Sequence, residues 1–406
     1  MPLPRGLRAL SHRDYRLFWL GQLLSRIGTW MQSVGQAWLV LELTNSPFRL
    51  GLISTLQFAP VLVFAFLGGV ISDRMAKRRI ILATQVAMML QAFALAALVW
   101  SGRVEYWHVA VLAAVYGVAN SIDMPARQAY VIELTGREDL LNAIALNSAV
   151  FNGARVVGPA LAGILIASHG VAAAFLINGI SFVAVLAALA AMRTEGAPRP
   201  GARATVREEV MEGLRYAART PSITLVLGLL LFVSLFVINF NVVVPLLARD
   251  VFAAGAQGYG LLMASLGIGA ILGALGVASA GLRRPSMPMV LVAAGVASLG
   301  VIGLALVKSF ALAAAVLVVT GLAQIVFTSS ANSTVQITVP DGMRGRMMSL
   351  YVLVFVGATP LGAFLTGSLA ETFGIAAACA VGGGAGLTSV LALAWTWHRH
   401  RASHRG

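Results

Sequence analysis

The chain has 406 residues, of which 59% are hydrophobic and only 11% are charged. A soluble domain carries roughly 25% charged residues, so this composition excludes a soluble enzyme and a disordered chain, and the single cysteine, Cys379, excludes a disulfide scaffold. The net charge of +14 is not a nucleic-acid signal, because the basic residues fall between long apolar runs, as membrane topology requires.

Twelve apolar runs are each long enough to cross a bilayer as a helix, which takes about 20 residues for a hydrocarbon core of about 30 Å. In chain order they cover 17–42, 48–72, 79–101, 106–128, 140–168, 171–192, 222–248, 257–280, 287–307, 310–338, 345–370 and 374–397. Spans of a membrane β-barrel would be about 10 residues long and strictly alternating. The runs therefore predict an all-α polytopic membrane protein with twelve transmembrane helices.

The distribution of Lys and Arg predicts the orientation in the membrane. With twelve crossings, one side of the membrane receives both termini and 23 of the 29 basic residues, the other side receives four, and Arg26 and Arg155 lie inside runs. Cytoplasmic loops carry the excess of Lys and Arg, so both termini should be cytoplasmic. We expect a multi-pass protein of the cell (inner) membrane that works as a monomer, without a nucleic-acid partner.

The longest polar stretch, 193–221, separates the first six runs from the last six. Thr205 and Glu208 have the spacing of a capping box. An apolar stripe at helical spacing follows, formed by Val206, Val210, Leu214 and Ala217. We expect an amphipathic helix on the cytoplasmic membrane surface, with a solvated linker as the alternative. The predicted domains are a six-helix bundle (1–192), this linker (193–221), a second six-helix bundle (222–397) and a basic tail (398–406).

The two halves of the chain resemble each other at an offset near 200 residues. Residues 155–165 resemble 355–365, and residues 49–73 resemble 259–280, so that Gly51 corresponds to Gly260. Transporters that work by alternating access are built from such repeats, with the substrate held near the membrane midplane between them. The repeat therefore predicts two pseudo-symmetric bundles around a substrate site.

A short motif after the second run, GVISDRMAKRR at 69–79, resembles the loop signature of the major facilitator superfamily. The matching residues are Gly69, Asp73, Arg74, Lys77 and Arg78, whereas Ala76 replaces the second glycine of the signature. The resemblance implies the fold of that superfamily. It also implies a conformational latch in which Asp73 binds the start of the eleventh helix, near 345–348, with Arg127 as a further member.

Longer stretches, 13–51 and 123–163, resemble the enterobactin-exporter and macrolide-efflux branch of the superfamily. The fifth run partly resembles the antiporter motif of drug exporters. We expect a hinge or packing role for Gly153, Gly158, Pro159 and Gly163, and for Pro360 in the repeat; ordinary helix packing is an equal alternative. Ala113 stands where proton-coupled drug exporters carry an arginine, which weakens assignment to that group.

Two arginines, Arg26 and Arg155, lie deep inside apolar runs, and no carboxylate lies at comparable depth. Ionisable residues in a membrane are costly, so each is a functional hypothesis. We expect a neutral to positive cavity that favours anionic or large neutral substrates. Alternatively, these arginines bind backbone carbonyls, Asn152 or glutamines. Further cavity candidates are Gln22, Trp30, Ser33, Gln36, Gln57, Asn152, Asn239, Asn241, Gln324 and Asn332.

The sequence contains no metalloprotease, serine-hydrolase or P-loop motif, so neither an enzyme nor an ATP-driven pump is expected. We expect no cofactor and no metal. The predicted function is a secondary active exporter of a siderophore, macrolide or other drug by proton antiport, with protons as the coupling ion and Asp123 as the best-placed proton carrier. The alternative is an importer of an organic anion or other metabolite in the same superfamily.

Overall fold

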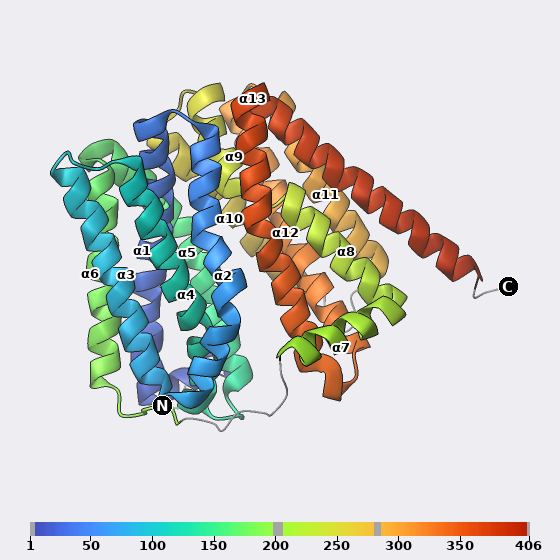
Figure 1. Cartoon of the computed structure of the whole chain (residues 1–406), viewed down its shortest axis with the longest axis horizontal. Coiled ribbons are helices and arrows are strands. Elements are labelled where there is room, and N and C mark those ends of the chain that lie inside the picture. The colour runs from blue at the N-terminus through green and yellow to red at the C-terminus, as the bar shows by residue number, and fades with distance from the viewer. Residues whose placement is uncertain (1–4, 198–205, 280–285, 404–406) are drawn as a thin grey trace. The chain divides into compact units, whose positions relative to one another are not determined.

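The computed structural model describes residues 5–197, 206–279 and 286–403, and every regular element among them is a helix (Figure 1). This confirms the all-α prediction. In chain order the elements are η1 (Arg5–Ser11), α1 (Arg13–Thr44), α2 (Pro47–Arg74), α3 (Lys77–Trp100), α4 (Tyr106–Thr135), α5 (Leu140–His169), α6 (Val171–Ala191), α7 (Val206–Arg219), α8 (Pro221–Phe236), α9 (Phe240–Leu246), η2 (Leu247–Val251), α10 (Gly255–Ser279), α11 (Met287–Leu306), α12 (Phe310–Thr338) and α13 (Asp341–Ser403).

Ten helical segments among the described residues are long and apolar enough to cross a membrane. One of them, Met343–Arg399, has 57 residues, enough for two crossings of about 20 residues each. Gly374 interrupts it with φ 82° and ψ 162°, a conformation that only glycine adopts readily, and Figure 1 shows two rods joined there. α1 is not among the ten, since it carries the polar stripe along its length. The count of twelve crossings stays a prediction.

The helices pack into two compact units, which are described separately. The first unit contains residues 1–45, 56–202 and 254–264, and the second contains 46–55, 203–253 and 265–406. α2 thus has its first nine residues in the second unit, and α10 has its first ten in the first unit. The predicted domain limits 1–192 and 222–397 stay a prediction.

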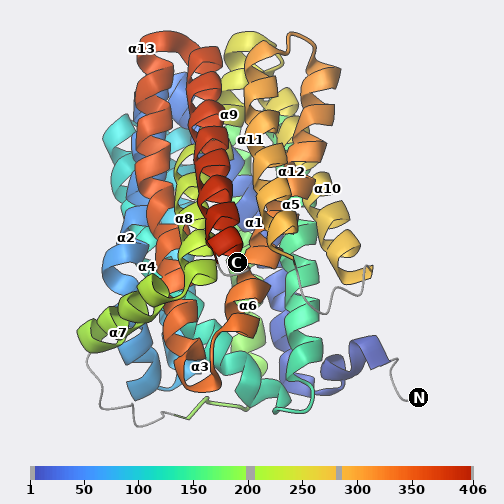
Figure 2. The same cartoon turned by 90° about the vertical axis from the view of Figure 1, so that its right-hand side faces the viewer.

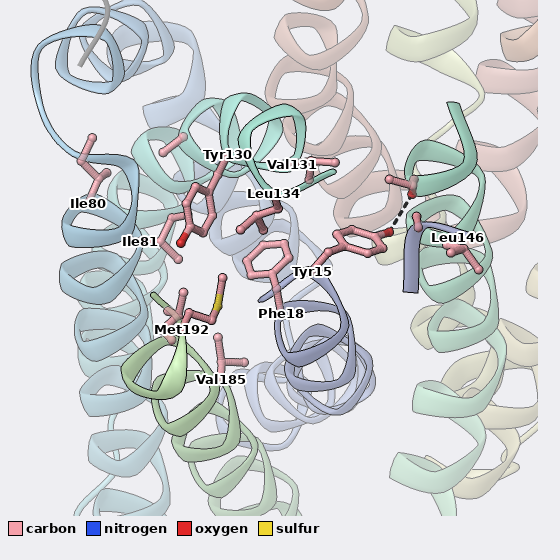
Figure 3. Close-up of a cluster of buried hydrophobic side chains, with 14 residues drawn as sticks. Tyr15, Phe18, Ile80, Ile81, Tyr130, Val131, Leu134, Leu146, Val185 and Met192 are labelled. Atoms are coloured by element: carbon pink, nitrogen blue, oxygen red, sulfur yellow. Dashed lines mark hydrogen bonds between the residues drawn. The ribbon is translucent and has the colours of Figure 1, made fainter. Parts of the chain in front are cut away.

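In the first unit, α1 packs on α5 and α6, and α3 packs on α4 and α6. A cluster of buried side chains fills one end of this unit, with Phe18 and Tyr130 in edge-to-face contact at 5.8 Å (Figure 3). The Tyr15 hydroxyl donates a hydrogen bond of 3.0 Å to the carbonyl of Ala143, which joins α1 to α5 inside this apolar cluster. Burial of this cluster fixes the ends of α1, α3, α4, α5 and α6 against one another.

In the second unit, α13 packs on α8 and α11, and α7 lies across α13 and α8 (Figure 2). α7 turns Gly213 and Ala217 inward, whereas Leu214 of the predicted apolar stripe is 45% exposed. Glu212 on α7 forms an ion pair of 2.9 Å with Arg346 on α13. Thr205 lies outside the described residues, as do the side chains of Val206, Glu208 and Val210, so the capping box and the membrane-surface position of α7 stay predictions.

Candidate functional site

A buried polar cluster lies inside the first unit, between α1, α3 and α4, and its centre is the Asp123 carboxylate, which is fully buried. One carboxylate oxygen accepts hydrogen bonds from the Thr84 hydroxyl at 2.7 Å and from the Gln85 amide at 3.1 Å. The other oxygen forms an ion pair with Arg127, one helical turn further along α4. Asp123 therefore has a partner for each oxygen although it lies among apolar helices.

This cluster contains more positive charge than negative charge. Arg127 also donates a hydrogen bond to Gln22 on α1. Arg26, one turn along α1 and half-buried, lies within electrostatic range of both Arg127 and Tyr116. Asp123 balances Arg127, and no carboxylate among the described residues forms an ion pair with Arg26, so the charge of Arg26 is in excess there. The amide nitrogen of Gln22 and the amide oxygen of Gln85 are buried and have no hydrogen-bond partner among the residues that the structure describes.

The polar stripe on α1 continues beyond this cluster with other partners. Gln36 is buried and donates a 3.1 Å hydrogen bond to Gln57 on α2, while Ser33 is half-buried. A second chain of amides was not predicted: Asn178 on α6 donates to Gln32 at 2.6 Å, and Gln32 donates to Gln91 on α3 at 2.8 Å. Gln32 neighbours Ser33 in sequence but points to another face of α1, so the spacing of the stripe could not reveal it.

Arg155 and its neighbours on α5 have different surroundings. Arg155 is half-buried and has an interaction partner. Asn152 donates a 2.9 Å hydrogen bond to the carbonyl of Ser148 in its own helix. Trp30 on α1 contacts Phe151 on α5 at 6.0 Å between ring centroids. A joint role of Arg155 and Asn152 stays a prediction.

The glycines expected to form hinges differ in their contacts. A Cβ at Gly158 would lie 2.5 Å from Cβ of Trp30, so α5 and α1 touch at this residue. A Cβ at Gly163 would lie 2.9 Å from the carbonyl oxygen of Ala256 on α10. Gly153 has no atom within 4 Å of its Cβ position. Close helix contact thus requires glycine at two of the three positions.

The second unit repeats this kind of contact with the first turns of α2. A Cβ at Gly51 would lie 2.5 Å from the carbonyl oxygen of Ala363 and 3.1 Å from Cα of Gly367. Thr55 donates a 2.8 Å hydrogen bond to the carbonyl of Pro360, which joins the start of α2 to α13. In the first unit, Gly260 touches Gly163 in the same manner, consistent with the correspondence of Gly51 and Gly260 in the repeat.

The seventh predicted span is broken near its middle, between α8 and α9. Asn239 lies at the break, is buried, and donates a 2.8 Å hydrogen bond to the carbonyl of Leu235. Its side-chain oxygen is buried and has no hydrogen-bond partner within the described part of the chain. Interrupted membrane helices need such side chains because the freed backbone groups cannot reach water. Asn241 is half-buried, and Gln324 is buried with a bonding partner.

A hollow of about 400 Å³ opens on α12 and α13 in the second unit. Its lining is polar and contains Thr328, Ser329, Asn332, Ser333 and Tyr351. The Asn332 oxygen accepts a 2.5 Å hydrogen bond from Gln336, and Tyr351 donates to the carbonyl of Thr328 at 3.1 Å. The Asn332 amide N–H groups and the Ser329 and Ser333 hydroxyls remain as donors that face no carboxylate in this lining. Of the predicted cavity residues, Asn332 is the one in this hollow.

The residues of the predicted latch separate into two groups. The side chains of Gly69 and Asp73 lie outside the described residues, and Arg74 is exposed, so the latch itself stays a prediction. Lys77 is only 1% exposed, and Arg78 is half-buried. Both bind the polypeptide just after α6, as detailed below. Arg127 belongs to the buried cluster around Asp123.

Helices of this length and hydropathy, packed in two units with buried polar clusters, define a multi-pass membrane protein. The chain matches the family described as transmembrane secretion effector over residues 5–402 and belongs to this family of the major facilitator superfamily. Members are transporters and not enzymes, so the predicted fold, family and non-enzymatic class are confirmed.

Three relatives span nearly the whole chain. The multidrug efflux pump Tap of Mycolicibacterium fortuitum is 28% identical, covering 87% of this chain and 88% of the relative. The staphyloferrin A transporter of Staphylococcus aureus is 24% identical, covering 89% and 90%. The enterobactin exporter EntS of Escherichia coli is 27% identical, covering 94% and 92%.

Solved structures show the same fold. A variant of the nucleoside transporter NupG superimposes with a TM-score of 0.77 at 12% identity, covering 94% of this chain and 98% of that one. An inward-facing bacterial homologue of the human lysosomal transporter Spinster gives 0.71 at 17% identity, covering 94% of each chain.

Proposed function

We propose that this chain is a secondary active exporter that moves a small organic molecule out of the cell by proton antiport and alternating access. The names of two relatives, the multidrug efflux pump Tap and the enterobactin exporter EntS, support the direction of transport. The name of the staphyloferrin A transporter supports a small organic substrate. The repeat and the two packed units support alternating access.

The buried Asp123 cluster carries the proposal of proton coupling. A coupling carboxylate must bind and release a proton during the transport cycle. Its surroundings must therefore shift the balance between its protonated and ionised forms. Asp123 is stabilised as an anion by Arg127, Thr84 and Gln85, so protonation would free Arg127 and Gln22 to take other partners. Proton binding would thereby be linked to the packing of α1 against α4.

The substrate class follows from the charge and hydrogen-bonding character of the described polar sites. Arg26 adds an uncompensated positive charge to the cluster, and the hollow on α12 offers neutral donors from Asn332, Ser329 and Ser333. Donors without carboxylates favour substrates rich in acceptors, such as carboxylates, catecholates or lactones, over lipophilic cations. We therefore propose an anionic or neutral oxygen-rich substrate.

The deciding experiment uses inverted membrane vesicles with an imposed pH gradient. Uptake of catechol siderophores, citrate-type siderophores, macrolides and ethidium would be compared with and without the gradient. Gradient-driven uptake of an oxygen-rich anion is the expected result. Preference for ethidium would overturn the substrate class, and uptake only into right-side-out vesicles would reverse the direction and favour the importer.

Two substitutions separate coupling from binding. Asp123→Asn should abolish the dependence on the pH gradient but retain substrate exchange across the vesicle membrane; gradient-driven uptake at the wild-type level would contradict the role of Asp123. Asn332→Asp should weaken binding of anionic substrates by placing a carboxylate in the hollow. Thr334→Val is the matched control, because the Thr334 hydroxyl bonds to the Ser330 carbonyl of its own helix and does not line the hollow.

A further inference from the structure

The polypeptide that follows α6, residues 193–197, is held by hydrogen bonds to three different helices. Asp14, in the first turn of α1, accepts hydrogen bonds of 2.8 Å from the backbone N–H groups of Arg193 and Thr194 and one of 2.9 Å from the Thr194 hydroxyl. The Tyr130 hydroxyl on α4 donates to the Thr194 carbonyl. These contacts place the segment next to the apolar cluster of Figure 3, which contains Tyr130 and Met192.

The first turn of α3 binds the rest of the segment. Its N-cap residue, Ala76, provides no side-chain acceptor, so the N–H groups at the start of α3 need partners elsewhere. The backbone N–H of Lys77 donates to the Gly196 carbonyl at 3.2 Å, and that of Arg78 donates to the Glu195 carbonyl at 3.2 Å. The linker therefore supplies the cap that the sequence of α3 lacks.

The side chains of the same two residues complete the binding. The Lys77 ammonium donates to the Ala197 carbonyl and lies 3.5 Å from the Glu133 carboxylate. The Arg78 guanidinium donates to the carbonyls of Leu189 and Ala190 at the end of α6, at 2.8 and 3.1 Å, and pairs with Glu195 at 3.0 Å. Glu195 is largely exposed, so its ion pair with Arg78 adds little stability. The hydrogen bonds from Arg78 to the carbonyls contribute most of the stability of this contact.

Gly196 shows that this fit is specific to the segment. Its φ is +76°, and a Cβ there would lie 2.9 Å from Cβ of Lys77 and 3.1 Å from the ring of Tyr130. Any other residue would be strained in its backbone and would collide with the buried lysine. Both the charge on α3 and the glycine in the linker are thus needed for the same contact.

We infer that Lys77 and Arg78 are positioning residues that anchor the start of the linker to the first unit, and that this role is separate from the latch implied for the loop motif. Lys77 is buried against the linker and Glu133, and Arg78 has all its described bonds with α6 and the linker. The anchored segment moves with the first unit. The inference does not depend on the substrate or on the direction of transport.

The test measures amide hydrogen exchange at 193–197 in the full-length protein reconstituted in lipid nanodiscs. Lys77→Met keeps the length and apolar stem of the side chain but removes the donor, and we expect exchange to accelerate on the order of tenfold through easier local opening. Lys77→Arg should restore most of the protection, and Gly196→Ala should reproduce the loss from the opposite side of the contact.

Arg79→Ala is the matched control, because Arg79 is adjacent, equally charged and exposed. It should leave exchange at 193–197 unchanged. Wild-type protection in Lys77→Met, or equal loss of protection in Arg79→Ala, would overturn the inference. Unfolding of a variant would appear as faster exchange throughout α1 and α6 and would be read separately from a change confined to the segment.

Discussion

Several buried polar side chains in this protein form hydrogen bonds with residues that lie far away in the sequence. The pair of Asp123 and Arg127 could be predicted, because residues four apart on a helix face each other. Thr84 and Gln85 could not, since nothing in the local pattern of α3 indicates that it faces α4 at that level. The same holds for Lys77, whose basic run is typical of a solvated loop although the residue is buried.

At this scale we predict that Arg127→Met destabilises the protein more than removal of both charges. The single change leaves a buried carboxylate without its cation, which costs about 3–5 kcal/mol, whereas Asp123→Asn with Arg127→Met removes the uncompensated charge. Thermal unfolding of purified protein in detergent would measure the difference. Equal melting temperatures for the two variants would contradict the prediction.

Among the elements, helix positions could be predicted from apolar runs because a bilayer demands about 20 such residues per crossing. The break between α8 and α9 could not, since residues 237–239 belong to one continuous apolar run and only the Asn239 side chain marks the place. The glycine contacts were predicted as a type, but the sequence does not distinguish Gly153 from Gly158. That difference depends on which face of α5 meets α1.

We therefore predict different effects on stability for the same substitution at two positions of α5. Gly158→Val forces a side chain onto Trp30 and the Ile27 carbonyl, and overpacking of this kind costs about 1–3 kcal/mol. Gly153→Val should be nearly neutral, because no atom lies within 4 Å of its Cβ position. The stability of both variants is measured by the folded yield after detergent extraction and by the melting temperature. A more damaging effect at Gly153 would refute the assignment of the packed face.

For the whole molecule, the charge distribution predicts that both termini lie in the cytoplasm. Cys379 is buried, so the wild-type protein should not react with a membrane-impermeant maleimide and serves as its own control. Gly6→Cys and His398→Cys should be labelled in inverted vesicles but not in intact cells, and Ser101→Cys, in the loop after α3, should show the reverse. Labelling of the two ends from opposite sides would exclude an even number of crossings.

The hydrogen bonds that hold the backbone of Arg193 and Thr194 have a consequence for proteolysis. A protease binds its substrate as an extended strand through backbone amides and carbonyls, and here those of Thr194 are already bonded to Asp14 and Tyr130. Trypsin should consequently spare the bond after Arg193 in the native protein despite the exposed arginine, and should cut it once Arg78→Ala loosens the segment. A nick at that bond would then report, on a gel, how often the segment detaches from its unit.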